Sequence, residues 1–500
     1  MLVAMTQTGC SDLLDQKPQG EWVEGDEGSG GSFQSDVFTL YAKIRGFHVT
    51  SGTTALAIHS FRSEDAEKGS TAADGAAHGR MFDNFEYIAT NGLIGSYWTN
   101  NYEIIILANK ILDDIAQTET KNGTLSEGDL INRSEAHFFR AYAFFNLVRA
   151  FGDVPKIDFK VVNAEEANIP KSPASEIYAL IDADLTVAEK NLPRTWSPVY
   201  IGRLTWGAAR ALHARTYMMR NDWNNMNAAS VDVVQSALYN LNTPYNQIFR
   251  ETGENSSESV FELQCTATPS QPGSDDIGSQ FAQVQGVRGA GEWNLGWGWN
   301  TPTQLLADAF EAGDPRKNET LLYFIKTGGD PSSIPANQPY GEKPIANADV
   351  INKYYNKKAY TNPSMRVTYT KSGYWFNIRL IRYSDVVLMA AESANELGRA
   401  GEAVNYLEMV RARARGTNSA VLPKVTTTDQ SELRDAIRHE RRVELGMEFD
   451  RFYDLVRWGI AREVLHAAGK TGYQDRHALL PLPQTEVDKS NGVLIQNPNY

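Results

Sequence analysis

Apolar residues recur at intervals of three and four along much of the chain, which is the spacing of one face of an α-helix. This spacing is clear between residues 97 and 115, and residues 131–151 are apolar on most sides, as in a buried helix. The turn at 152–155 should end that helix, and another helix is predicted over 173–192. The pattern therefore predicts a largely helical first half.

Two later segments, residues 211–238 and 381–415, each read as two helices joined by a short turn. Alanines such as Ala211, Ala214 and Ala390 occupy positions where the paired helices must approach closely. Helical hairpins of about 34 residues are typical of tetratricopeptide repeats. Ordinary antiparallel helix packing explains the same pattern equally well. The predicted fold class is mostly α, with tetratricopeptide-like hairpins forming a scaffold.

The helical periodicity fades between the two hairpins, where Pro, Gly, Asn, Ser and Trp become frequent. Only short strand-like runs stand out there, at 260–263 and 374–378. A long irregular region carried by a helical scaffold is a common place for binding residues. We therefore expect an N-terminal helical region (36–240), an irregular ligand-binding insertion (241–380) and a C-terminal helical region (381–500).

Arginines, carboxylates and large aromatic residues crowd residues 438–459 more densely than a solvated helix requires. A helix should begin at Asp429, which is a favourable N-cap with Glu432 three positions later. Along this helix Glu440 and Glu444 share a face with aliphatic side chains. The sequence thus predicts two carboxylates inside the protein.

Two hypotheses account for these glutamates. Paired carboxylates can perform the acid and base steps of glycoside hydrolysis. Alternatively they belong to a structural ion-pair network, in which Arg382, Arg451 and Arg457 are the expected partners. The density of arginines favours the structural hypothesis, because a catalytic acid needs a raised pKa.

The composition excludes several classes of function. The formal net charge of −13 argues against nucleic acid as a partner and against binding to an anionic membrane surface by charge. No run of 18 apolar residues predicts a membrane-spanning helix. Phosphate-loop, nucleophile-elbow and zinc-binding HExxH motifs are absent, so we expect neither an enzyme nor a bound metal or cofactor.

The two cysteines are predicted to have different roles. Thr8-Gly9-Cys10 resembles the end of a bacterial lipoprotein signal, in which the cysteine is acylated, although Gln7 replaces the usual leucine and a basic start is missing. The residues alone favour an acylated Cys10 and an unmodified one equally. In the first case residues 1–10 are a partial signal, and residues 11–35, rich in Gly, Ser, Asp and Glu, form a flexible tether. Cys265 should be a buried free thiol.

The strongest candidate for ligand binding is the run 289–300, in which three tryptophans lie within seven residues. Sugars present flat apolar faces and a rim of hydroxyls, so aromatic platforms beside polar side chains suit them. Trp293, Trp297, Trp299 and Asn294 are the candidate residues, and Trp297 and Trp299 would face the same side of an extended run. The alternative is a loop that plugs the scaffold with its indoles buried.

Other candidates are weaker. The acidic loop 60–69 has oxygen ligands for calcium, but a solvated charged loop explains it more simply. Trp98 and Asn101 lie one helical turn apart and have the chemistry to bind a sugar, although a core position for Trp98 is the favoured interpretation. The pair 374–375 is a minor platform or half of a buried strand.

Five motifs in order carry a resemblance over essentially the whole chain. The segment 438–459 closely resembles the C-terminal signature of the SusD/RagB-like outer-membrane nutrient-binding lipoproteins of Bacteroidetes, and similar motifs occur at 98–109, 144–155 and 381–398. The ending 480–500 is similar too, with Asn499 where glycine is usual.

The resemblance implies a SusD-like helical fold and a lipid-anchored protein at the cell surface. It implies capture of oligo- or polysaccharides for a partner SusC-like TonB-dependent outer-membrane transporter, with the membrane reached only through the lipid anchor. It also implies a structural role for the C-terminal motif and a glycan site bordered by Phe61, Asp65 and Phe82. Peptide capture is the alternative within the same family.

Overall fold

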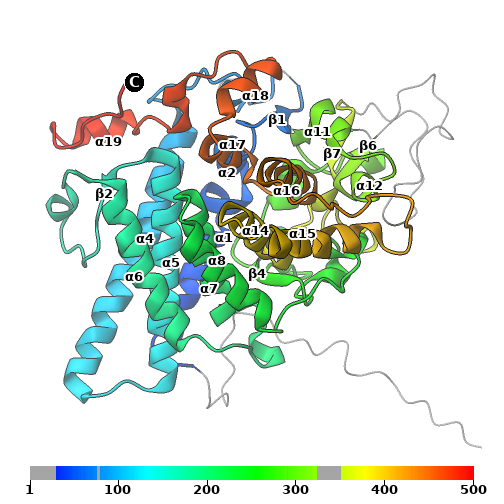
Figure 1. Ribbon diagram of the computed structural model, residues 1–500. Coiled ribbons are helices and arrows are strands. Elements are labelled where there is room, and N and C mark those ends of the chain that lie inside the picture. Colours follow the sequence, from blue (N-terminus) through cyan, green and yellow to red (C-terminus); the bar gives the residue numbers. More distant parts are fainter. Residues whose placement is uncertain (1–29, 72, 76–78, 290, 324–339, 341–350) are drawn as a thin grey trace, which may run out of the picture.

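A computed structural model describes residues 30–71, 73–75, 79–289, 291–323, 340 and 351–500. Its longer helices are α1 (Gln34–Arg45), α4 (Gly92–Asn122), α5 (Glu127–Phe151), α6 (Ala174–Asn191), α7 (Trp206–Met219), α8 (Trp223–Gln235), α14 (Tyr383–Glu396), α15 (Ala400–Arg415) and α16 (Gln430–Glu444). Shorter helices are α2 (Thr53–His59), α3 (Arg80–Asp83), α9 (Tyr245–Ile248), α10 (Phe281–Gln285), α11 (Gln304–Ala309), α12 (Arg316–Thr320), α13 (Pro363–Thr368), α17 (Arg451–Arg457), α18 (Ala461–Ala467) and α19 (Gln484–Lys489). The predicted mostly α fold is confirmed (Figure 1).

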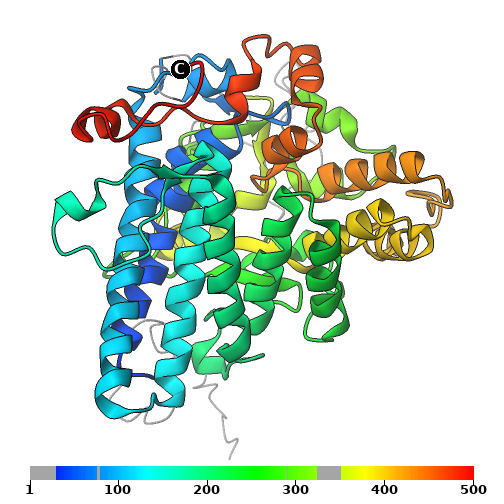
Figure 2. The ribbon, with the colours of Figure 1, turned by 60° about the vertical axis from the view of Figure 1, so that its left-hand side comes forward.

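Helices α4, α5, α6 and α7 stand side by side in chain order (Figure 2). Local sequence sets their ends, because Asn91 and Ser126 cap α4 and α5 by accepting hydrogen bonds from backbone N–H groups two and three residues ahead. The predicted stop after α5 is confirmed, since its C-cap is Gly152 in a positive-φ conformation. Among the described residues, no helix has the length and apolar character needed to cross a membrane.

The two predicted helical hairpins are present as α7–α8 and α14–α15. They pack on each other through α8 and α14, and α16 lies against α14 and α15. Helix α14 is buried from Tyr383 to Asn395, which explains why small alanines replace larger side chains along it. The hairpins therefore form one packed scaffold with the N-terminal helices.

Short antiparallel strand pairs lie outside the helical scaffold: β1 (Ala66–Gly69) with β5 (Trp299–Pro302), β2 (Val154–Pro155) with β3 (Lys171–Ser172), β4 (Ser259–Leu263) with β8 (Ile378–Arg382), and β6 (Leu321–Tyr323) with β7 (Tyr354–Asn356). The strand predicted over 260–263 is confirmed. The one predicted over 374–378 is wrong, because the strand begins at Ile378. Before it, the Tyr374 carbonyl accepts from Ser279 N–H and Asn377 N–H donates to Glu254, so side chains and loops use the backbone groups that a strand would pair.

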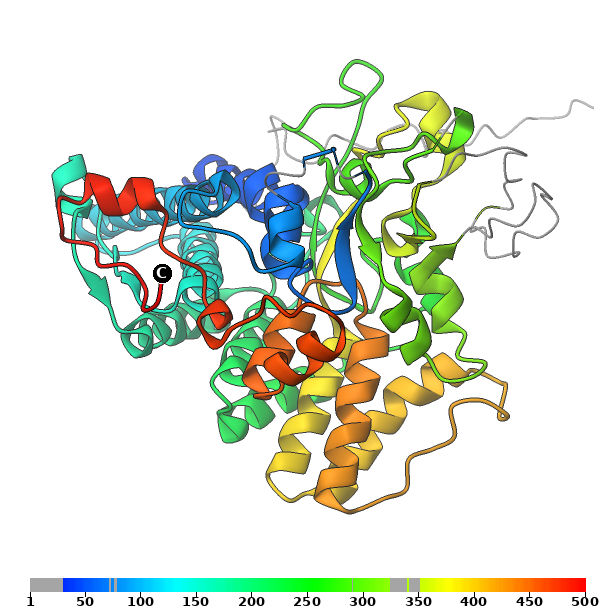
Figure 3. The same cartoon turned by 90° about the horizontal axis from the view of Figure 1, so that it is seen from above.

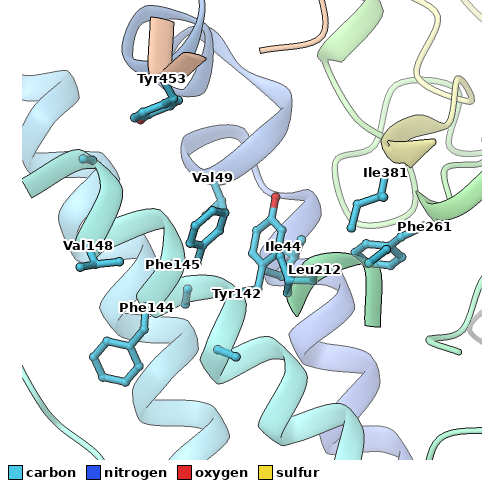
Figure 4. Packing of buried hydrophobic residues seen from close by; sticks show 14 of the residues in the cluster. Ile44, Val49, Tyr142, Phe144, Phe145, Val148, Leu212, Phe261, Ile381 and Tyr453 are labelled. Atoms are coloured by element: carbon cyan, nitrogen blue, oxygen red, sulfur yellow. The ribbon is translucent and has the colours of Figure 1, made fainter. Parts of the chain in front are cut away.

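One large cluster of buried side chains joins elements from both halves of the chain. Figure 4 shows Ile44 of α1, Tyr142 of α5 and Leu212 of α7 close to Phe261 of β4 and Ile381 of β8. The irregular region is thus attached to the helical scaffold through the β4–β8 pair.

The C-terminal segment packs against the upper ends of the N-terminal helices (Figure 3). Leu480 N–H donates to Ala150 O, and the Asn497 side-chain amide donates to Phe151 O and Leu480 O. The proline-rich ending recognised in the sequence therefore fastens the end of α5.

Candidate functional site

The tryptophan run predicted as a binding loop is fastened to the end of α10. Trp297 N–H donates to Gln283 O and Gly298 N–H donates to Gly286 O, both at 2.9 Å. Leu295 N–H donates to Val287 O, also at 2.9 Å. The loop is therefore rigidly placed by backbone hydrogen bonds, and β5 follows directly after it.

Two glycines make this close approach possible. A Cβ atom at Gly296 would lie 2.0 Å from Gln283 O, and Gly298 has a φ of +70°. The turn at Gly298 breaks the extended run that would have placed Trp297 and Trp299 on one side. Trp297 is partly exposed, whereas Trp299 is only 7% exposed, so the predicted common face is wrong.

The other two indoles belong to the interior. The Trp299 indole N–H donates to Asp74 at 3.1 Å, and the Lys68 ammonium lies 4.9 Å from the ring centroid. Trp293 is 2% exposed and stacks on Tyr360 with centroids 6.0 Å apart, while Asn294 beside it is exposed. Of the three tryptophans, Trp297 is therefore the one with a surface for a ligand.

Two further partly exposed aromatic side chains flank Trp297. Phe47 opens a π-helix, η1 (Phe47–Ser51), and its ring centroid is 6.3 Å from that of Trp297. Tyr374 donates its hydroxyl to the Gln283 side-chain oxygen at 3.3 Å, so Gln283 links it to Trp297. We call Phe47, Trp297 and Tyr374 the aromatic row.

Polar groups border the aromatic row. His48 follows Phe47, and its Nδ1 lies 2.9 Å from the Thr54 hydroxyl. Burial lowers the pKa of His48, although the Glu103 carboxylate opposes this, so the imidazole is neutral at pH 7. Burial raises the pKa of Tyr374, which keeps its hydroxyl protonated. With the Gln283 amide, these neutral groups suit sugar hydroxyls.

Two pockets near the row are too small for a sugar. One, lined by Gln285, Tyr355 and Thr361 among others, offers about 10 Å³. Another, between Phe281, Met447 and Phe449, offers about 20 Å³. Each has room for about one water molecule. An extended ligand would therefore lie on the open surface of the aromatic row.

Several residues predicted to border a glycan site are core residues instead. Phe61 and Phe82 are 0% exposed, and Phe82 stacks on Tyr87 with centroids 4.8 Å apart. Trp98 is 4% exposed and packs between aromatic rings of the core, which agrees with the favoured interpretation of this residue. Asn101 is 0% exposed and donates to Tyr97 O. None of these side chains presents a face to a ligand.

The acidic loop 60–69 is not the solvated loop that was expected, because arginines pair with its buried carboxylates. Glu64 pairs with Arg451 at 2.5 Å, and Asp65 pairs with Arg442 at 2.5 Å. Both carboxylates are 2% exposed, and the loop continues into β1. Their charges are balanced inside the protein, so Asp65 is not available to a sugar.

The glutamates of α16 lie in a buried ion-pair cluster, as the structural hypothesis predicts. Glu440 contacts Arg316 at 2.6 Å and Arg411 at 2.7 Å. Glu444 contacts Arg413 at 2.6 Å, Arg382 at 2.9 Å and Arg316 at 3.2 Å. Burial alone would raise the pKa of Glu444, but the surrounding guanidinium groups outweigh it and hold the pKa well below its usual range.

The predicted partners of these glutamates were only partly right. Arg382 contacts Glu444, but Arg451 pairs with Glu64, and Arg457 pairs with Glu392 at 2.7 Å and Asp454 at 2.8 Å. The cluster uses Arg316, Arg411 and Arg413 instead, because α12 and α15 pack beside α16. The helical spacing identified the buried carboxylates but not partners from distant segments.

Of the two cysteines, Cys265 is the one that the structure describes. Cys265 is a free, partly buried thiol, and burial raises its pKa to about 11. Cys10 and residues 11–29 lie outside the described residues, so lipidation and a tether over 11–29 stay predictions. The tether was predicted to reach residue 35, but Ser32 N–H donates to Asp129 and α1 begins at Gln34, so its last residues belong to the folded part of the chain.

Comparison with known proteins identifies the family of the chain. A family model described as the SusD family matches residues 257–500, and a model described as starch-binding and associating with the outer membrane matches residues 41–218. The chain belongs to the SusD family. The second description also indicates association with the outer membrane.

Three similar proteins match over nearly their full length. SusD-like protein P2 of Formosa agariphila is 28% identical, over 100% of this chain and 98% of the relative. The structure of a laminarin-binding SusD-like protein is 26% identical with a TM-score of 0.76, covering 93% of this chain and 98% of the other. Surface glycan-binding protein A from Bacteroides thetaiotaomicron, solved with laminarihexaose, is 22% identical with a TM-score of 0.75, covering 94% and 99%, which shows a shared fold.

Proposed function

We propose that this protein captures oligo- or polysaccharide at the cell surface and that the aromatic row is its binding surface. The observation that carries the proposal is the placement of three partly exposed rings: Phe47 lies beside Trp297, and Gln283 links Trp297 to Tyr374. Two similar structures, those of a laminarin-binding protein and of a laminarihexaose complex, support glycans as the ligand class.

Binding would rest on stacking and hydrogen bonding without bond cleavage. Each exposed ring offers an apolar face to a sugar, and the neutral His48 and Gln283 groups exchange hydrogen bonds with hydroxyls. An open row admits the middle of a polymer as well as its end. Glu440 and Glu444 are 0% exposed and paired with arginines, which argues against their acting as glycosidase carboxylates.

The chain would work from a tether. In this proposal Cys10 carries a lipid anchor, residues 11–29 form the tether, and the helical regions 36–240 and 381–500 support the binding insertion 241–380. Trp297 and Tyr374 come from the insertion and Phe47 comes from the N-terminal region. The captured glycan would pass to a SusC-like TonB-dependent transporter.

The test is retardation of the purified protein in native gels cast with plant, microbial and host polysaccharides, laminarin included. Trp297→Ala should abolish the retardation by the bound polymer, because it removes the largest ring of the row. Trp223→Ala is the matched control, since Trp223 is also partly exposed but lies at the start of α8.

Each outcome of this experiment has a distinct meaning. Retardation that survives Trp297→Ala would support glycan capture but would show that the aromatic row is not the binding surface. Loss in both variants would indicate a general structural defect. Migration unchanged by every polysaccharide of the panel would contradict glycan capture and favour the peptide-binding alternative. The net charge of −13 would suit cationic peptides.

A further inference from the structure

The connection between α6 and α7 exposes apolar side chains that the proposed glycan site does not use. Val199 is 56% exposed and Ile201 is 41% exposed, on either side of Tyr200 in the short helix η3 (Pro198–Tyr200). Trp196 and Tyr200 are partly exposed, with ring centroids 5.8 Å apart and planes tilted by 57°. We call Trp196, Val199, Tyr200 and Ile201 the α6–α7 patch.

Contacts with Leu204 and Arg203 hold the patch in place. The Trp196 indole N–H donates to Leu204 O at 2.8 Å, and the Arg203 guanidinium lies 4.2 Å from the Trp196 ring centroid. Arg203 is itself fixed by an ion pair with the buried Glu135 at 2.8 Å. The two aliphatic side chains are therefore presented to the outside by a supported loop.

The start of the described chain lies beside this patch. The Arg203 guanidinium donates to the Gln34 side chain at 3.3 Å, and Gln34 is the first residue of α1. Cys10 and Gly30 are 20 positions apart, and the intervening residues are rich in Gly and charged groups. As the proposed tether, a chain of that length would span about 25 Å on average. A lipid on Cys10 would thus hold the α6–α7 patch near the bilayer.

We propose that the α6–α7 patch rests on the lipid surface to which the protein is anchored, an inference that depends on the proposed acylation of Cys10. Trp and Tyr favour the head-group level of a bilayer, and exposed aliphatic side chains reach the upper acyl chains. Lys190 and Arg194, which precede the patch in the chain, are both exposed and can meet lipid phosphates. Protruding Val199 and Ile201 offer no flat face, which disfavours a sugar as the occupant.

This contact would orient the glycan site. Phe47 follows α1 closely, and the 12 residues of that helix separate it from Gln34 by about 18 Å. With the patch on the lipid, the orientation of the aromatic row relative to the membrane would be fixed. The tether alone would leave the molecule free to tumble.

The test is a depth measurement on the full chain held by its N-terminus. The protein, with an N-terminal histidine tag and the C10S and C265S substitutions, is bound to phosphatidylcholine vesicles containing a nickel-chelating lipid. A nitrobenzoxadiazole fluorophore is attached at V199C or, as the matched control, at V367C, because Val367 of α13 is 89% exposed. Brominated acyl chains should lower the emission at position 199 by about twofold and leave position 367 unchanged.

Other results would overturn the inference. Equal emission with and without brominated lipid at position 199 excludes contact with the bilayer. Emission that responds to laminarin but not to brominated lipid would make the patch a sugar contact. The anchor is tested separately by flotation of the bacterially processed chain with and without C10S, so its failure is distinguishable from failure of the patch.

Discussion

Replacing Glu444 by glutamine should destabilise the protein strongly without touching the glycan site. The Glu444 carboxylate lies within 3.2 Å of Arg316, Arg382 and Arg413, whose side chains are at most 6% exposed. Glu444→Gln keeps the shape and removes the charge. Three guanidinium groups then lose a counter-charge inside the protein.

The magnitude follows from the burial of the cluster. Removing one partner of a buried ion pair costs about 3–5 kcal/mol, because the remaining charge stays desolvated. Unfolding a chain of this length releases roughly 1 kcal/mol/K of entropy, so the melting temperature should fall by about 3–5 °C. The free energy of unfolding from urea titration at pH 7 is the direct measurement.

The matched control is Glu402→Gln, which removes an exposed carboxylate from α15 and should change stability by less than about 0.5 kcal/mol.

The pH dependence gives a second check. The folded pKa of Glu444 is depressed, so its stabilisation is present above the unfolded pKa of about 4.3 and is lost as the pH falls. The difference between wild type and Glu444→Gln should therefore shrink in acid.

An E444Q protein that unfolds at the wild-type urea concentration would refute this reasoning. Loss of a glycan-hydrolysing activity with unchanged stability would instead revive the catalytic hypothesis for α16.

Three further predictions test other parts of the structure. Gly296→Ala should weaken glycan retardation, since its Cβ would lie 2.0 Å from Gln283 O, whereas Gly401→Ala has no atom within 4 Å and should have no effect. Burial raises the pKa of Asp83 to about 7, although a lysine opposes this shift. The fold therefore loses stability as the pH rises from about 4 to 7 and this carboxyl ionises. In a urea titration at pH 8, Asp83→Asn should be more stable than wild type. Because the pKa of the Cys265 thiol is about 11, it should react with Ellman's reagent at pH 8 about 200-fold more slowly than a free thiol. The rate is measured in the C10S protein, and a fast reaction would contradict the burial of Cys265.

The sequence predicted the features that depend on neighbouring residues. Asp429 does cap α16 by accepting from Ser431 and Glu432 N–H groups, although the Glu432 side chain bonds Thr427 instead of closing a capping box. The long helices, the two hairpins and the buried position of Glu440 followed from periodicity in the same way. These signals are local, so tertiary packing did not override them.

The candidate site was only partly predictable, because exposure depends on distant packing. The tryptophan run contained Trp297, but the φ of Gly298 decided which indole faces outward. Phe47 joins the row from a π-helix that has no clear sequence signature. Arg316 reaches Glu440 across 124 positions of the chain, a distance over which spacing carries no information.

The buried ion-pair cluster has a consequence for how the protein is made. Its charges come from Glu258, Asp314, Arg316, Arg382, Arg411, Arg413, Glu440 and Glu444, so the cluster cannot close until the last of these is available to fold. Until then the arginines must remain hydrated, and the segments that carry them cannot settle against one another. The half of the chain after residue 258 should therefore acquire resistance to proteases in a single late step, and truncation before Glu440 should leave it digestible throughout.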